Sequence, residues 1–474
     1  MPCLVSLLSW ASLLSLLSLV SLVSLVSLAA TASAVAQTGT RTPDRAYMSG
    51  FFSEAIGGLL ERAKMKPLGD EELQLLGSSY MLRATFFEQM HRLQIAIGTA
   101  YYTRRDTSQG FVSIPVNDYY LGRYLFEDAK FAAASDRFSE IATVLNIDTP
   151  IRQKAAIWKA AIGTRIDGVH AAESFASLTQ DLAEADADVR LELAFAQSRE
   201  DHGATGVPAV RAVPDHDPDY RLVWFAARNR LLTTMSQGTE PLIANPRPDF
   251  VYNVDEEFSV SFYDPPLFDV LAYADYTAAL AAFEQVSGNK EMATFGGICA
   301  YAIGDYEVAT RLLTAAGTDR ARIYLSLIES EDPESAVEPN LSSNRARIEW
   351  AALTGRGQAL LDLVKVDETE VLQDRLTLQA VSLALIEAGA GAEVVKLVGS
   401  VYPLHRRKDD RIYPTLTAIE TAAVLSLPDG DFRIVLTNLY GLIKAYPVVA
   451  NVFDMAQGLA APDGDYLVSK KRTD

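Results

Sequence analysis

The chain has 474 residues, 49% of them hydrophobic and 22% charged, with a formal net charge of −19. A chain of this length is too long for one compact core, so several subdomains or a solenoid are expected, and the hydrophobic content excludes a disordered chain. Because the negative charge repels phosphates and anionic lipids, the composition argues against nucleic acid or a membrane surface as a general partner.

The first 36 residues contain no Lys, Arg, Asp or Glu, and Leu4 to Ala30 form a Leu/Val/Ser tract. Ser33-Ala34-Val35-Ala36-Gln37 follows, a small-x-small pattern typical of a secretory cleavage site. We therefore expect a signal peptide over 1–36, cleaved after Ala36, and a periplasmic or secreted protein. The tract lacks a preceding basic residue and is long enough to span a bilayer, so a retained anchor is the alternative.

Helical periodicity begins after a short linker at 38–43. Apolar residues recur at three- and four-residue steps from Tyr47 to Leu60, which predicts an amphipathic helix. Pro67 to Asp70 should end this helix and cap the next one. A polar loop is then expected from Asp106 to Val116, because it contains Gly110 and Pro115.

Small and bulky residues recur later at matching intervals. The first set is Gly122, Leu125, Ala134 and Phe138. The second set has the same steps of three, nine and four and consists of Gly297, Ala300, Ala309 and Leu313. In the second set a Gly304-Asp305-Tyr306 turn separates the halves, so one helix should end at Gly304 and the next should begin with the Asp. Small residues at such spacing let two helices approach closely.

Partial copies of this pattern occur elsewhere. Two segments repeat the second half: Asp275-Tyr276 with Ala279 and Phe283, and Gly430-Asp431-Phe432 with Val435 and Leu439. Tyr446-Pro447 follows the last of these, where a second helix should end. Leu76-Gly77-Ser78-Ser79-Tyr80 matches the first half, but Gln89 stands where a small residue is wanted, so this copy is degenerate.

Together these segments resemble the tetratricopeptide repeat (TPR), whose Gly…Tyr…Ala…Phe…Pro spacing is a solenoid signature. The resemblance implies an all-α fold, an irregular TPR-like α-solenoid of antiparallel helix pairs. It also implies a scaffold role in the bacterial cell envelope. An unrelated helical fold is the alternative, since Ala/Leu-rich helices with Gly turns are common.

A proline-rich break at 239–266 divides the expected array into an N-terminal half, 37–238, and a C-terminal half, 267–461. Within the break, Phe258, Val260 and Phe262 alternate with serines, so a small β-hairpin or an ordered loop is expected near 250–263. The tail 462–474 is expected to be disordered.

Motifs for metal or cofactor chemistry are weak. Asp215-His216-Asp217-Pro218-Asp219 alternates acids as a calcium loop does, but Tyr220 replaces the required glycine and Ala226 replaces the closing glutamate. A helix-capping turn is the better interpretation. The basic cluster His405-Arg406-Arg407-Lys408 is offset by acids and suits a solvated loop. Cys299 is expected to pack as a small hydrophobe.

No zinc, phosphate-loop, dinucleotide or nucleophile-elbow motif is present. We therefore expect no catalytic residues, metal or cofactor, and the binding residues cannot be named. The expected function is that of an exported TPR-like scaffold or adaptor for a protein or peptide, not an enzyme. Carbohydrate capture by a repeat protein is the first alternative, although a lipoprotein cysteine is missing. A helical hydrolase with paired carboxylates is the second.

Overall fold

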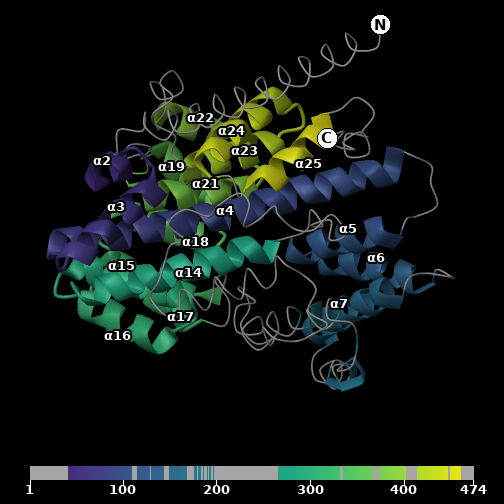
Figure 1. Ribbon diagram of the computed structural model, residues 1–474, viewed down its shortest axis with the longest axis horizontal. Helices are drawn as coiled ribbons and strands as arrows, with labels where there is room; N and C mark the ends of the chain where they lie inside the picture. Colours follow the sequence, from purple (N-terminus) through teal and green to yellow (C-terminus); the bar gives the residue numbers. More distant parts are fainter. Residues whose placement is uncertain are drawn as a thin grey trace, which may run out of the picture.

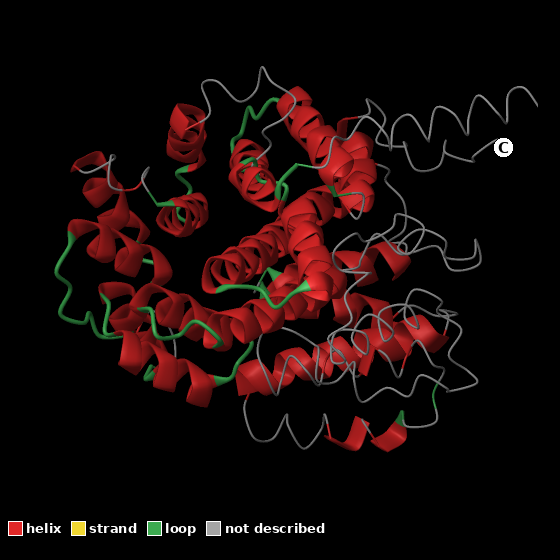
Figure 2. Cartoon of the chain, turned by 60° about the vertical axis from the view of Figure 1, so that its left-hand side comes forward, coloured by secondary structure: helices red, strands yellow, loops and turns green. Residues whose placement is uncertain are grey.

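The computed structural model describes most of two stretches of the chain. These are 41–108, 115–128, 130–143, 149–167, 265–330, 335–366, 374–401, 414–446 and 449–460, with Val371 and isolated positions between 176 and 196. Every regular element within them is helical (Figure 2), which confirms the all-α class. The expected signal peptide, hairpin, acidic turn, basic cluster and tail lie outside the described residues.

The described helices follow one another along both stretches. The first stretch contains α2 (Pro43–Met48), α3 (Phe52–Met65), α4 (Asp70–Ser108), α5 (Pro115–Glu127), α6 (Phe131–Thr143) and α7 (Thr149–Asp167). The second begins with α14 (Pro265–Glu284), α15 (Lys290–Ala302), α16 (Tyr306–Ala316), α17 (Asp319–Ile328) and α18 (Asn344–Leu353). It continues with α19 (Gly357–Val366), α21 (Arg375–Glu387), α22 (Gly391–Val401), α23 (Pro414–Leu425), α24 (Phe432–Ala445) and α25 (Ala450–Ala460).

The turn between α15 and α16 forms where the sequence predicts it. Gly304 has φ +79°, a left-handed conformation that glycine adopts without a steric cost. The Asp305 carboxylate then accepts a 3.1 Å hydrogen bond from the backbone N–H of Val308 and caps α16. Asp431 caps α24 in the same way, and that helix ends at Ala445, directly before Tyr446.

The recurring small residues lie at helix crossings. Ala134, Ala279 and Ala309 are each 0% exposed. A methyl group on Gly297 would stand 2.5 Å from Cγ of Leu313, and one on Gly122 would stand 2.8 Å from the ring of Phe138. Helices α15 and α16, and likewise α5 and α6, therefore pack closely because these positions carry no larger side chain.

The degenerate copy around Gly77 does not form a helix pair. Helix α4 runs unbroken through Gln89 for 39 residues, about 58 Å at 1.5 Å per residue. The stretch between Gly77 and Gly98 contains no proline, glycine or asparagine to stop it. Apolar side chains lie on all sides of α4, which is typical of a helix buried in the core.

Helix α4 joins the two ends of the described chain. It packs against α14, α23 and α25 as well as its neighbours α3 and α5, and Figure 1 shows the yellow C-terminal helices lying along it. The ring of Phe283 in α14 fills the space beside Gly77, where a methyl group would stand 2.7 Å from it. From α15 to α25, by contrast, helices mainly pack against near neighbours in sequence.

Two predicted boundaries are wrong. The proline-rich break was expected to reach Pro266, but α14 begins at Pro265, because proline is tolerated in the first turn of a helix. The polar loop was expected from Asp106, but α4 continues to Ser108. None of the described helices has the length and apolar character needed to cross a membrane.

Candidate ligand pocket

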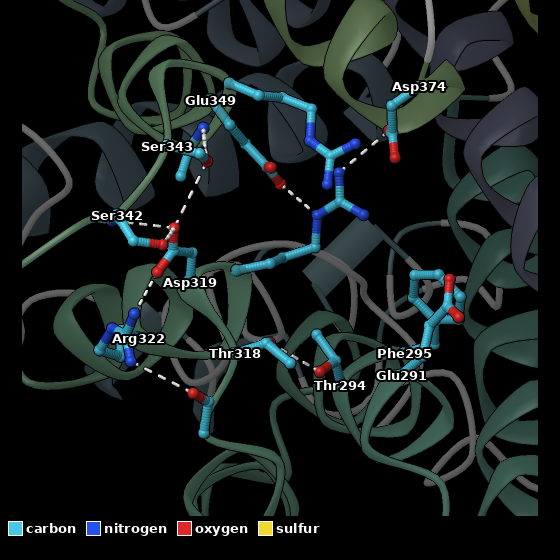
Figure 3. Close-up of a pocket in the computed structure, with 14 residues that line it drawn as sticks. Glu291, Thr294, Phe295, Thr318, Asp319, Arg322, Ser342, Ser343, Glu349 and Asp374 are labelled. Atoms are coloured by element: carbon cyan, nitrogen blue, oxygen red, sulfur yellow. Dashed lines mark hydrogen bonds and ion pairs between the residues drawn. The ribbon is translucent and has the colours of Figure 1, made fainter. Parts of the chain in front are cut away.

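A pocket of about 610 Å³ lies at the N-terminal ends of α15, α17 and α18 and beside the residue that precedes α21 (Figure 3). Three residues that cap these helices line it. Thr318 accepts a hydrogen bond from Ala321 N–H at 3.1 Å, and Ser343 accepts one from Ala346 N–H at 3.1 Å. Asp374 accepts one from Thr377 N–H at 2.9 Å. The pocket therefore collects the electropositive ends of several helices.

Arg320 ties three helices together at this pocket. Its Nε donates to Glu349 of α18 at 2.6 Å, and its Nη2 donates to Asp374 at 3.0 Å. The same Nη2 also donates to the Thr377 hydroxyl of α21 at 3.2 Å. The Arg320 side chain is 13% exposed, so the network sits at the boundary between core and cavity.

The two carboxylates on Arg320 differ in their protonation behaviour. Burial raises the pKa of Glu349, and the opposing charge of Arg320 does not fully offset it. Burial also pushes the pKa of Asp374 upward, but the charge of Arg320 and the N–H of Thr377 outweigh it, so that pKa is lowered. At neutral pH Arg320 is cationic, because both carboxylates raise its pKa against the effect of burial.

Asp319 fixes the rim of the pocket. Its Oδ2 accepts hydrogen bonds from Ser342, at 3.0 Å from the backbone N–H and 2.6 Å from the hydroxyl. Its Oδ1 pairs with Arg322, which also donates to the Gly317 carbonyl at 3.2 Å. In Figure 3 these groups lie at the left of the pocket. The segment before α18 is thus held against the start of α17.

Two charged side chains in the pocket wall make no such bonds. Arg345 on α18 and Glu291 on α15 are exposed, and neither side chain forms a hydrogen bond or ion pair within the described part of the chain. Arg345 acts on Glu349 and Asp374 only through space, by lowering their pKa values. Phe295 adds an aromatic side chain beside Glu291.

This arrangement suits recognition of a polar ligand. Arg320 and Arg322 are held in place by carboxylates, so the wall is preorganised before anything binds. Within the described residues no three His, Cys, Asp or Glu side chains gather as they would around a metal ion.

No binding residues were predicted from the sequence, although a repeated sequence pattern marks two helices of this pocket. Two segments share a capping residue, one intervening residue and then Arg-Ala-Arg. They are Thr318-Asp319-Arg320-Ala321-Arg322 and Ser343-Asn344-Arg345-Ala346-Arg347. Cys299 lies outside the pocket wall and is fully buried in α15; burial raises the pKa of its thiol, so the thiolate is suppressed.

Comparisons of the chain with protein-family models, with curated proteins and with solved structures gave no match. The resemblance to tetratricopeptide repeats therefore rests on the spacing of residues in the sequence alone.

Proposed function

We propose that this chain is an exported, TPR-like adaptor that binds a peptide segment of a partner protein in the pocket between α15, α17 and α18. The observation that carries the proposal is which helices form the pocket wall. The N-terminal ends of α15, α17 and α18 form this wall, and Arg320 of α17 makes ion pairs with Glu349 of α18 and with Asp374. Repeat arrays present concave binding surfaces built from neighbouring repeats.

A repeated turn supports the pairing of these helices. Gly304 lies between α15 and α16, Gly355 between α18 and α19, and Gly389 between α21 and α22, each with positive φ. The first helices of the last two pairs pack on one another, α18 on α21, and the single helix α17 packs against both α15 and α18. This order favours an irregular solenoid of antiparallel pairs, with α4 as an added helix along it.

Export is the part of the proposal supported by sequence alone. The charge-free tract over 1–36 and its small-x-small end favour a cleaved signal, with a location in the periplasm or outside the cell.

A photo-crosslinking amino acid placed at Phe295 tests the proposal in cells that produce the protein. We expect a covalent adduct that protease digests, because Phe295 lies in the pocket wall. The matched control is Tyr306, an aromatic residue on the second helix of the same pair that is 55% exposed. It should give no such adduct.

Two outcomes would contradict the proposal. One is a Phe295 adduct that a glycosidase digests and a protease does not, which would favour carbohydrate capture. The other is tight binding of a small molecule without capture of any polypeptide. Repeating the experiment after deletion of 250–263 tests whether the expected hairpin contributes to capture.

A further inference from the structure

Arg320 and Arg345 occupy equivalent positions on successive helices. Each is the second residue after a helix cap, Thr318 or Ser343, and each precedes a buried alanine. Both side chains line the same pocket. Because the backbone positions match, a difference between the two arginines reflects what surrounds each guanidinium.

The difference is that one arginine is paired within the protein and the other is available. Arg320 is engaged by Glu349 and Asp374, and Arg322 by Asp319. Arg345 is exposed and forms no hydrogen bond or ion pair within the described residues. Among acidic groups of the wall, Glu291 is the counterpart: its carboxylate has no such bond within those residues either. Among the described residues of the pocket wall, one cation and one anion thus form no bond within that part of the chain.

We propose that the pocket selects a peptide segment that carries both an acidic and a basic side chain. This inference rests on the proposed function and names the ligand class. The acidic carboxylate pairs with Arg345, whose planar guanidinium suits a bidentate contact, and the basic group pairs with Glu291. About 610 Å³ lies within the range of small-ligand sites and accommodates a few residues.

Four blocked tetrapeptides test the ligand class by calorimetric titration of the full chain. One carries Asp and Lys, two carry a single charge with Asn or Gln in the other place, and one carries Asn and Gln. Acetylated and amidated ends remove terminal charges. The dipolar peptide should bind about tenfold more tightly than either singly charged peptide, because each contact is a charge-assisted hydrogen bond.

Two substitutions test which pocket residue recognises each charged side chain of the peptide. Arg345→Gln should abolish the preference for Asp over Asn, and Glu291→Gln should abolish the preference for Lys over Gln. Two control residues are exposed, form no side-chain bonds in the described chain and lie outside the pocket wall: Arg347 on α18 and Glu307 in the first turn of α16. Arg347→Gln and Glu307→Gln should leave all four affinities unchanged. Circular dichroism confirms that each variant is folded.

Equal binding of the neutral and dipolar peptides, or binding of none of the four, overturns the inference. So does an Arg345→Gln variant that keeps the Asp preference. These failures are distinct from failure of the proposed function. If Phe295 still crosslinks a polypeptide, peptide recognition stands and only its charge class is wrong.

Discussion

Arg83 and Arg320 each tie helices together, and the two arginines differ in their surroundings. Arg83 of α4 holds Asp275 of α14 through two hydrogen bonds of 2.7 and 2.8 Å, and both side chains are 0% exposed. Arg320 joins α17, α18 and α21 with similar bonds, but it lines an open cavity. One pair is sealed inside the core, whereas the other network borders a cavity, with the Arg320 side chain 13% exposed.

The contrast indicates that the Arg83–Asp275 pair stabilises the fold, whereas the Arg320 network shapes the pocket. Burial raises the pKa of Asp275 against the charge of Arg83, so the carboxylate depends on that arginine to remain ionised. Arg83 also donates to the Ser53 hydroxyl at 3.1 Å, which brings α3 into the same junction. At the pocket, partial solvation lowers the cost of an unmatched charge, so loss of Arg320 should affect binding more than folding.

The largest expected effect follows removal of Asp275. Asp275→Ala leaves the Arg83 guanidinium buried without its counter-charge, and we expect a loss of about 3–5 kcal/mol in the free energy of unfolding. Chemical denaturation measures it. Replacing both partners, Arg83→Met with Asp275→Leu, should recover most of the loss, because no buried charge remains. A double variant as unstable as the single one would contradict this account.

Substitution of Arg320 should have a smaller effect on stability. Arg320→Gln removes the charge that pairs with buried Glu349, and we expect a loss of about 2 kcal/mol. It should also weaken binding of the dipolar peptide, because the pocket wall is no longer fixed. Arg311→Gln is the control: its ion pair with Glu284 is exposed and should contribute less than about 1 kcal/mol. Equal losses in the two variants would show that the network does not order the pocket.

The smallest effect is a pH dependence at the pocket rim. Burial raises the pKa of Asp319, but hydrogen bonds from Ser342 and the charge of Arg322 outweigh it, and the pKa is lowered overall. A carboxyl group whose pKa is lower in the folded than in the unfolded state stabilises the fold at pH values above its unfolded pKa, about 3.9. This stabilisation is lost as the pH falls through the folded pKa. Unfolding measured from pH 6 to pH 2.5 should therefore be less pH-dependent in Asp319→Asn. A slope in Asp319→Asn equal to that of the unsubstituted chain would contradict this account.

Local features of the fold were predictable from sequence. The turn at Gly304 and Asp305 follows from glycine conformation and capping chemistry, and the close approach of Gly297 to Leu313 follows from helical spacing. Such features depend on residues at most 16 positions apart, so they are visible in the sequence.

Long-range features were not predictable. Gly77 matches a repeat position, but its bulky partner, Phe283, comes from a distant helix. Arg83 and Asp275 are 192 positions apart, and neither residue type predicts burial. The pocket combines both kinds of information: the repeated Arg-Ala-Arg marks α17 and α18, whereas Glu291 of α15 joins them only through packing.

The unbroken span of α4 has a consequence for how the protein is made. Tyr124, on the helix next to α4, contacts Met455 of α25 across 331 positions, and α4 itself is covered by α14, α23 and α25. During translation, the apolar surface of α4 leaves the ribosome long before the helices that cover it exist. Such a chain stays vulnerable to aggregation until α25 is synthesised, because α25 covers part of α4.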